Sequence, residues 1–167
     1  IKCHGYGSGP RFDFVRVGFN AKMNELTAAM GLESLERFDE IFAERHVIRN
    51  ALIDALSQFE NDLIIYRDSP GEMISPHAFP IVLRDETRNI MPLYDHLEKS
   101  GIQVKTLFGS LPTQHKAFEF LGHKLGDFPV AERIGRTGLH FGCNEFMAED
   151  DVGFIADKIG EWLKCST

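Results

Sequence analysis

The chain has 167 residues, of which 43% are hydrophobic and 26% charged, a composition typical of a globular protein. It has 18 Lys and Arg against 25 Asp and Glu, and this net charge of −7 argues against a broad nucleic-acid-binding surface. No apolar run is long enough to span a membrane, and the Gly-rich opening lacks a secretory pattern. Three widely spaced cysteines form no disulfide framework, so we expect a cytoplasmic location.

The first third of the chain is expected to be irregular and then helical. Glycines and a proline interrupt every period in residues 1–19. Apolar residues then recur at three- and four-residue steps, which predicts helices over residues 23–59 with a kink or a break at Gly31 and Ser34. Either Asn20 or Asn24 is expected to cap the start of this helical stretch.

The remainder alternates between strands and helices. Pro80 predicts an edge position or a bulge for its strand, Pro92 falls in the first turns of a helix, and Gly101 ends that helix. Strands are predicted at residues 63–66, 75–84, 102–108 and 139–141, and helices at 87–100, 114–121, 129–135 and 149–164. This order predicts an α+β sandwich, in which helices pack on one face of a small, mainly antiparallel sheet.

Residue types and spacing alone indicate little chemistry. The seven histidines show no paired spacing such as His-Glu-x-x-His, and no Cys-x-x-Cys occurs, so we predict no metal site. No serine stands in a Gly-x-Ser-x-Gly context, so a hydrolase is unsupported. Cys143 is interpreted as a buried thiol.

Several sequence blocks resemble one enzyme family. Residues 18–35, GFNAKMNELTAAMGLESL, resemble the Gly-aromatic-Asn-x-basic-Met block of the DegT/DnrJ/EryC1/StrS aminotransferases. Further blocks resemble the same family in the same order, at residues 49–56, 79–83, 97–102, 128–132, 138–140 and 147–151. The resemblance implies the aspartate-aminotransferase-like fold of pyridoxal-phosphate enzymes. Residues 1–34 would be the end of the large cofactor-binding domain with an interface helix, and residues 35–167 the small C-terminal α/β domain.

The resemblance also implies an activity for the complete protein. Such a protein transfers an amino group from glutamate to a nucleotide-linked keto sugar, in cell-surface polysaccharide or amino-sugar biosynthesis, and works as a homodimer with pyridoxal 5'-phosphate. The cofactor-bearing lysine of the family lies earlier in the chain, so we predict no catalytic residue here and expect this chain alone to be inactive. Residues 107–110 resemble the branch of sugar dehydratases, which leaves that activity open. A non-catalytic fragment that only dimerises is the third alternative.

Three residues take candidate roles from the resemblance. Asn20 matches an asparagine that reaches the cofactor phosphate of the neighbouring subunit, and a plain helix cap is its alternative role. Lys22 stands where relatives often have Arg, and Lys105 begins a stretch that contacts substrate in relatives. Both lysines are expected to bind the substrate.

Overall fold

The computed structural model describes residues 23–107 and 114–165. Asn20 and Lys22 therefore lie outside the described residues. The chain divides into two compact units, Ile1–Glu40 and Ile41–Thr167. The domain boundary predicted between residues 34 and 35 stays a prediction.

Helix α1 (Glu25–Glu36) lies in the first unit and shows which asparagine is the cap. The Asn24 side-chain oxygen accepts a hydrogen bond from the backbone N–H of Thr27 at 2.8 Å, so Asn24 caps the helix. The predicted break at Gly31–Ser34 is wrong, because α1 continues to Glu36. The helix ends instead at Arg37, whose backbone leaves the helical conformation and whose guanidinium pairs with Glu40 at 3.0 Å.

The following elements carry the chain into and through the second unit. They are α2 (Phe38–Leu56), the 3-10 helix η1 (Ser57–Phe59), β1 (Leu63–Ile65), β2 (Ala78–Leu83), α3 (Met91–Lys99), β3 (Val104–Thr106), the 3-10 helix η3 (Lys116–Leu121), α4 (Pro129–Thr137), β4 (Gly138–Gly142) and α5 (Glu149–Cys165). Every strand and helix predicted here exists, although most strands are shorter than expected.

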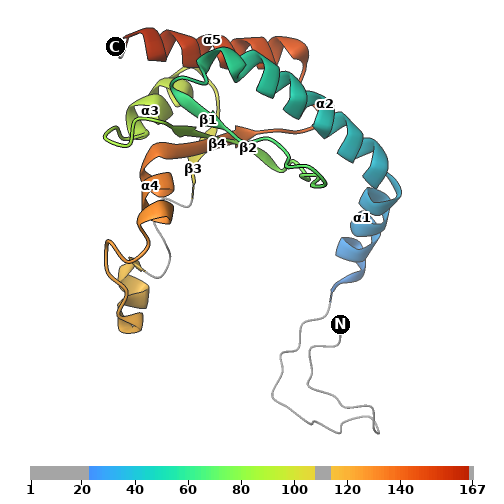
Figure 1. Ribbon diagram of the computed structural model, residues 1–167. Coiled ribbons are helices and arrows are strands. Elements are labelled where there is room, and N and C mark those ends of the chain that lie inside the picture. Colours follow the sequence, from blue (N-terminus) through green and yellow to red (C-terminus); the bar gives the residue numbers. More distant parts are fainter. Residues whose placement is uncertain (1–22, 108–113, 166–167) are drawn as a thin grey trace, which may run out of the picture. The chain divides into compact units, whose positions relative to one another are not determined.

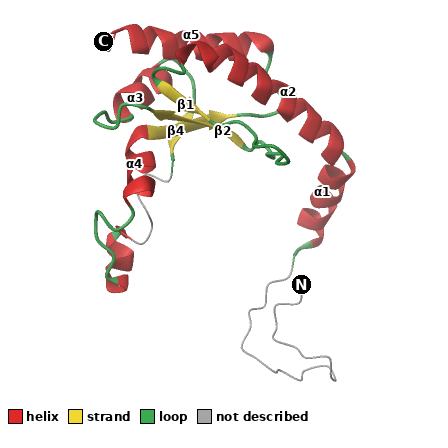
Figure 2. Ribbon diagram, in the orientation of Figure 1, coloured by secondary structure: helices red, strands yellow, loops and turns green. Residues whose placement is uncertain are grey.

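The four strands form one sheet in the order β1-β2-β4-β3, and all three neighbouring pairs are antiparallel. The strands are drawn in yellow in Figure 2. This confirms the predicted antiparallel sheet. β2 has partners on both sides at Ile81 and Val82, so it is not an edge strand there, whereas Ala78 to Pro80 pair with β4 alone. Pro80 itself has no partner on β1, because the β1–β2 ladder ends at Ile81, and its missing N–H therefore removes no hydrogen bond from that ladder.

Helix α3 shows how local polar groups set an element's ends. It begins at Met91 and not at residue 87, because the Asp85 carboxylate accepts hydrogen bonds from the N–H and the hydroxyl of Thr87 and holds a turn there. Pro92 lies in the first turn, as predicted. Gly101 has a φ of 85°, which favours glycine, and ends the helix as predicted.

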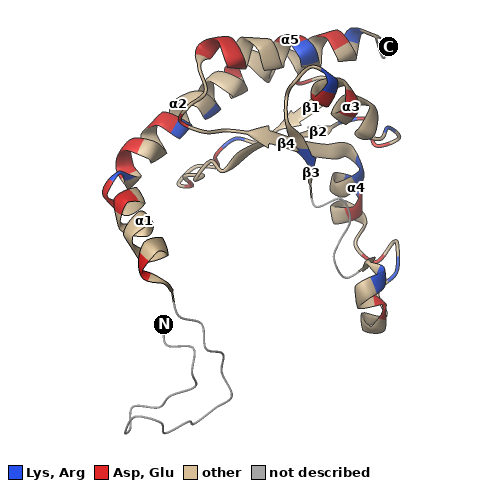
Figure 3. Ribbon diagram, turned by 180° about the vertical axis from the view of Figure 1, so that it is seen from behind, with Lys and Arg blue, Asp and Glu red and all other residues tan. Residues whose placement is uncertain are grey.

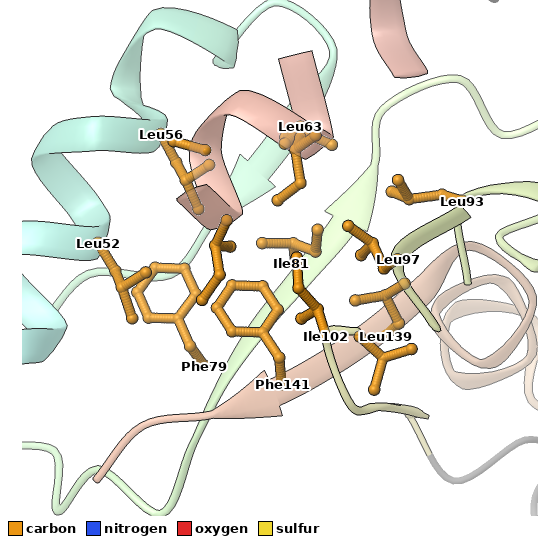
Figure 4. Packing of buried hydrophobic residues seen from close by; sticks show 14 of the residues in the cluster. Leu52, Leu56, Leu63, Phe79, Ile81, Leu93, Leu97, Ile102, Leu139 and Phe141 are labelled. Carbon is orange, nitrogen blue, oxygen red and sulfur yellow. The ribbon is translucent and has the colours of Figure 1, made fainter. Parts of the chain in front are cut away.

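Helices α2, α3 and α5 lie on one side of the sheet, as predicted, whereas α4 departs from the prediction and lies on the other side (Figure 1). The core is between the sheet and these three helices. The rings of Phe79 and Phe141 stack there with centroids 5.5 Å apart, and leucines from α2 and α3 surround them (Figure 4). Burial of such apolar surface is the main favourable term in folding.

The contact between α5 and η1 gives a stability prediction. A Cβ added at Gly160 would lie 2.8 Å from Cζ of Phe59, whereas one at Gly153 on the same helix meets nothing within 4 Å. Replacing Gly by Ala within a helix stabilises it by about 1 kcal/mol, and overpacking a core costs about 1–3 kcal/mol. We therefore expect Gly153→Ala to raise the free energy of unfolding, and Gly160→Ala to lie about 1–3 kcal/mol below it. Urea denaturation of both variants measures this, and equal stabilisation by both would contradict the close contact.

Candidate functional site

The candidate site lies on the face of the sheet that turns away from the main core. Phe79, Phe141 and Val104 are neighbours across β2, β4 and β3, and all three are buried. Successive side chains of a strand point to opposite faces. The adjacent row, formed by Pro80, His140 and Lys105, therefore points to the opposite face.

This face carries a hollow of about 140 Å³ that is rich in basic groups. It is lined by His77, Ala78, Gln103, Lys105, His140, Phe141 and Gly142. Figure 3 shows the strands almost uncoloured, since β1, β2 and β4 contain no Lys, Arg, Asp or Glu, and β3 bears a single basic position. The hollow therefore combines one lysine and two histidines with no carboxylate.

Arg45 of α2 positions two of the segments that border the hollow. Its Nε donates to a carboxylate oxygen of Glu145 at 2.8 Å, and its Nη1 donates to the carbonyl of Pro76 at 3.4 Å. Pro76 directly precedes His77, and Glu145 follows β4 by three residues. One guanidinium thus holds the backbone before β2 and the chain after β4.

A second arginine of the same helix anchors the segment between β1 and β2. Arg49 is buried, its Nη2 lies 3.0 Å from a carboxylate oxygen of Asp68, and it donates to the carbonyl of Tyr66 at 3.3 Å. Removing one partner of a buried ion pair is strongly destabilising, because the other charge is left without compensation. Arg45 and Arg49 therefore fix both ends of the segment that leads to His77.

The electrostatic environment keeps His140 neutral over a wider pH range than an isolated histidine. Partial burial lowers the pKa of His140 below 6.5, and the positive charges of Lys105 and His77 lower it further. Among the described residues, the side chains of these three groups make no hydrogen bond or ion pair with one another or with a carboxylate. The hollow therefore holds basic groups whose hydrogen-bonding capacity is directed toward a ligand or solvent.

The start of β4 requires a glycine where the sheet meets α4. A Cβ at Gly138 would lie 2.7 Å from the carbonyl oxygen of Ile134 and 2.5 Å from Cδ1 of Leu107. Any side chain there would displace the strand relative to the end of β3. Gly138 thus keeps His140 and Lys105 in register.

Glu132 of α4 organises the loop that precedes the helix. Its carboxylate accepts hydrogen bonds from the side-chain amide of Gln114 at 2.6 Å and from the backbone N–H groups of Gly126 and Phe128. The bond from Gln114 is the largest cause of the lowered pKa of this carboxyl, and the two N–H groups add to it. Within the block at residues 128–132 that resembles the family, Glu132 therefore holds the loop that precedes α4.

Of the three predicted site residues, the structure describes one. Lys105 lies in the hollow, while Asn20 and Lys22 lie outside the described residues. The sequence did not identify His77 and His140 as site residues, because neither stands in a metal-ligand spacing. The period of two along 138–142, with His140 between the apolar Leu139 and Phe141, is the signal that places His140 on the face opposite to the core.

Two further observations limit the chemistry of the described part of the chain. No group of three or more His, Cys, Asp or Glu comes together there as a metal site. None of the helices in residues 23–107 and 114–165 combines the length and apolar character that crossing a bilayer requires.

Solved structures share this architecture. DesV from S. venezuelae, solved in complex with a ketimine intermediate, superposes with a TM-score of 0.82 at 19% identity, covering 96% of this chain and 42% of that one. The small antiparallel sheet with its helices therefore forms part of the predicted aspartate-aminotransferase-like fold.

The sequence comparisons identify the family. Residues 1–160 match the model of the DegT/DnrJ/EryC1/StrS aminotransferase family, and the chain belongs to this family. It is 25% identical to a GDP-perosamine synthase from Vibrio cholerae over 99% of the chain and 44% of that protein. It is also 25% identical to a dTDP-4-dehydro-2,6-dideoxy-D-glucose 3-dehydratase from Saccharopolyspora spinosa over 96% of the chain and 35% of that protein. The chain thus spans less than half the length of these curated relatives.

The described residues do not by themselves fit pyridoxal phosphate. The pyridine ring nitrogen in such enzymes is paired with an Asp or Arg side chain, and neither residue type lines the hollow around Lys105. The residues that would hold the cofactor ring therefore belong to other parts of the family fold, and we assign no cofactor chemistry to Lys105.

Proposed function

We propose that this chain is the C-terminal portion of an aminotransferase that moves an amino group from glutamate to a nucleotide-linked keto sugar, with pyridoxal phosphate as cofactor. The family match over residues 1–160 carries this proposal. The basic hollow supports it, because Lys105 lies where a negatively charged substrate finds no repelling carboxylate. The small domain then supplies a substrate contact from Lys105, and Lys22, in the preceding segment, adds a second positive charge for the nucleotide part.

A sugar dehydratase is the second candidate. One relative at 25% identity is a 3-dehydratase of a dTDP-linked sugar, and residues 107–110 of this chain, LFGS, resemble that branch of the family. The two reactions share the fold and the substrate class, so the small domain alone does not separate them.

The reaction products separate the two candidates. We expect the complete protein, given pyridoxal phosphate, glutamate and a panel of dTDP- and GDP-linked keto sugars, to form an amino sugar and one equivalent of 2-oxoglutarate. Mass spectrometry of the sugar and an assay of 2-oxoglutarate measure this. A deoxygenated keto sugar without transfer of nitrogen identifies the dehydratase, and formation of neither product contradicts both candidates.

We further propose that the complete protein is a homodimer whose interface includes α1. Helix α1 has no buried residue, and its large apolar side chains are strongly exposed, with 81% for Leu26 and 74% for Met30. Such exposed apolar surface favours a protein partner. We expect light scattering to give the mass of two chains, and Leu26→Glu to shift the protein toward the monomer. Glu33→Gln serves as the control on the same helix, and a monomeric wild-type protein contradicts the proposal.

We also propose a cytoplasmic location, in keeping with a nucleotide-linked substrate. Its support is that the two described cysteines, Cys143 and Cys165, are free thiols. Fractionation of the source cells tests it, and recovery of the protein outside the cytoplasm contradicts it.

Asn20 is proposed to donate a hydrogen bond to the cofactor phosphate of the neighbouring subunit. Its alternative role was to cap the helix, and Asn24 performs that role. A hydrogen bond to a charged group contributes about 1.5–3 kcal/mol, so we expect Asn20→Leu to weaken cofactor binding by about ten- to hundredfold. Measurement of cofactor release from the complete protein tests this.

The matched control is Asn24→Ala, which removes the observed cap. We expect this variant to lose about 1 kcal/mol of stability while it retains the cofactor. If Asn20→Leu lowers the melting temperature and leaves cofactor release unchanged, the proposed role of Asn20 is wrong.

A further inference from the structure

His77 and His140 lie beside Lys105 in the hollow, a grouping that the sequence did not predict. The register pairs Lys105 of β3 with His140 of β4, and His77 directly precedes β2, which pairs with the other side of β4. All three line the same hollow of about 140 Å³. Three segments that are far apart in the sequence thus present basic side chains to one small volume.

The arrangement is unfavourable without a ligand. Lys105 and His77 both oppose protonation of His140, and its partial burial acts in the same direction. The charged groups that act on His140 are Lys105 and His77, and no carboxylate is among the causes of its lowered pKa. An anion in the hollow would remove this repulsion, since it is attracted to all three groups.

We propose that this hollow on the open face of the sheet binds a phosphate-type oxyanion, with Lys105, His140 and His77 as its ligands. The lysine ammonium and each imidazole N–H are donors that match oxygen acceptors, and such charge-assisted bonds are short and strong. A phosphate carries up to two negative charges, which match Lys105 and one protonated histidine, whereas a carboxylate carries one.

The charge balance gives the sign of the pH dependence. The free His140 is neutral near pH 7, because its pKa is lowered below 6.5. A bound dianion favours the protonated imidazole and raises this pKa, so binding takes up a proton. Affinity for a dianion of fixed charge must therefore rise as the pH falls through the pKa of His140.

The proposal deepens the proposed function, because a nucleotide-linked sugar carries a diphosphate and glutamate carries carboxylates. The diphosphate and the carboxylates differ in charge and geometry. A binding experiment on this chain can therefore distinguish them. It requires no turnover, so its result is independent of whether the complete protein proves to be an aminotransferase or a dehydratase.

The test follows the imidazole resonances of the 167-residue chain by NMR. Inorganic phosphate and glutamate are titrated separately at pH 6.5 and constant ionic strength. Sulfate is titrated between pH 5 and pH 8, because it keeps both negative charges throughout. We expect phosphate to shift the His77 and His140 signals more strongly than glutamate, and sulfate to bind at least tenfold more tightly at pH 5 than at pH 8.

Variants separate the proposed ligands from general charge effects. We expect Lys105→Gln to weaken sulfate binding at least tenfold, Lys105→Arg to retain most of it, and His140→Gln to remove most of the pH dependence. Lys99→Gln removes an exposed lysine of α3 and is the matched control for charge. The proposal is overturned if Lys105→Gln binds as the wild type does, if Lys99→Gln weakens binding equally, if binding is independent of pH, or if glutamate binds more tightly than phosphate.

Different results would contradict the proposed activity and the proposed anion site. A complete protein that forms neither amino sugar nor deoxygenated sugar, but whose His140 signal still responds to phosphate in a way that depends on Lys105, leaves the anion site intact. Normal transfer of nitrogen with no phosphate response at His140 overturns the anion site alone.

Discussion

The alternation of side chains along the paired strands β2 and β4 is the constraint on which the rest of the second unit depends. On one face, the stacked rings of Phe79 and Phe141 anchor the core under α2, α3 and α5. A shift of one residue in this pairing would exchange the two faces. It would turn Phe141 to the open side and bury His140, so the hydrophobic core and the basic hollow are fixed by the same register.

Helix α2 connects this core to the site. Leu52 and Leu56 pack into the core, while Arg45 and Arg49 of the same helix hold the backbone of Pro76 and the segment after β1. The position of His77 therefore depends on how α2 packs, although no residue of α2 lines the hollow. Gly138 likewise fixes the position of β4, because only a residue without a side chain allows the strand to approach Ile134 so closely.

The relatives of this chain include a perosamine synthase and a 3-dehydratase at the same identity of 25%. A shared fold does not by itself determine the reaction. Both kinds of relative are named for nucleotide-linked sugars, and a basic hollow without carboxylates suits the constant part of such substrates.

Local patterns in the sequence determined the order of helices and strands and the antiparallel sheet, because periodicity, Pro92 and Gly101 act over a few residues. The family was indicated by the resemblance of ordered sequence blocks, and the family match over residues 1–160 confirmed it. Helix ends depended on competing local partners, so Asn24 and not Asn20 became the cap, and Arg37 and not Gly31 ended α1. Pro80 was compatible with an interior strand because β1 ends before it. Only the tertiary structure joined His77, Lys105 and His140, since strand pairing brings together residues that are 28 to 63 positions apart in the sequence.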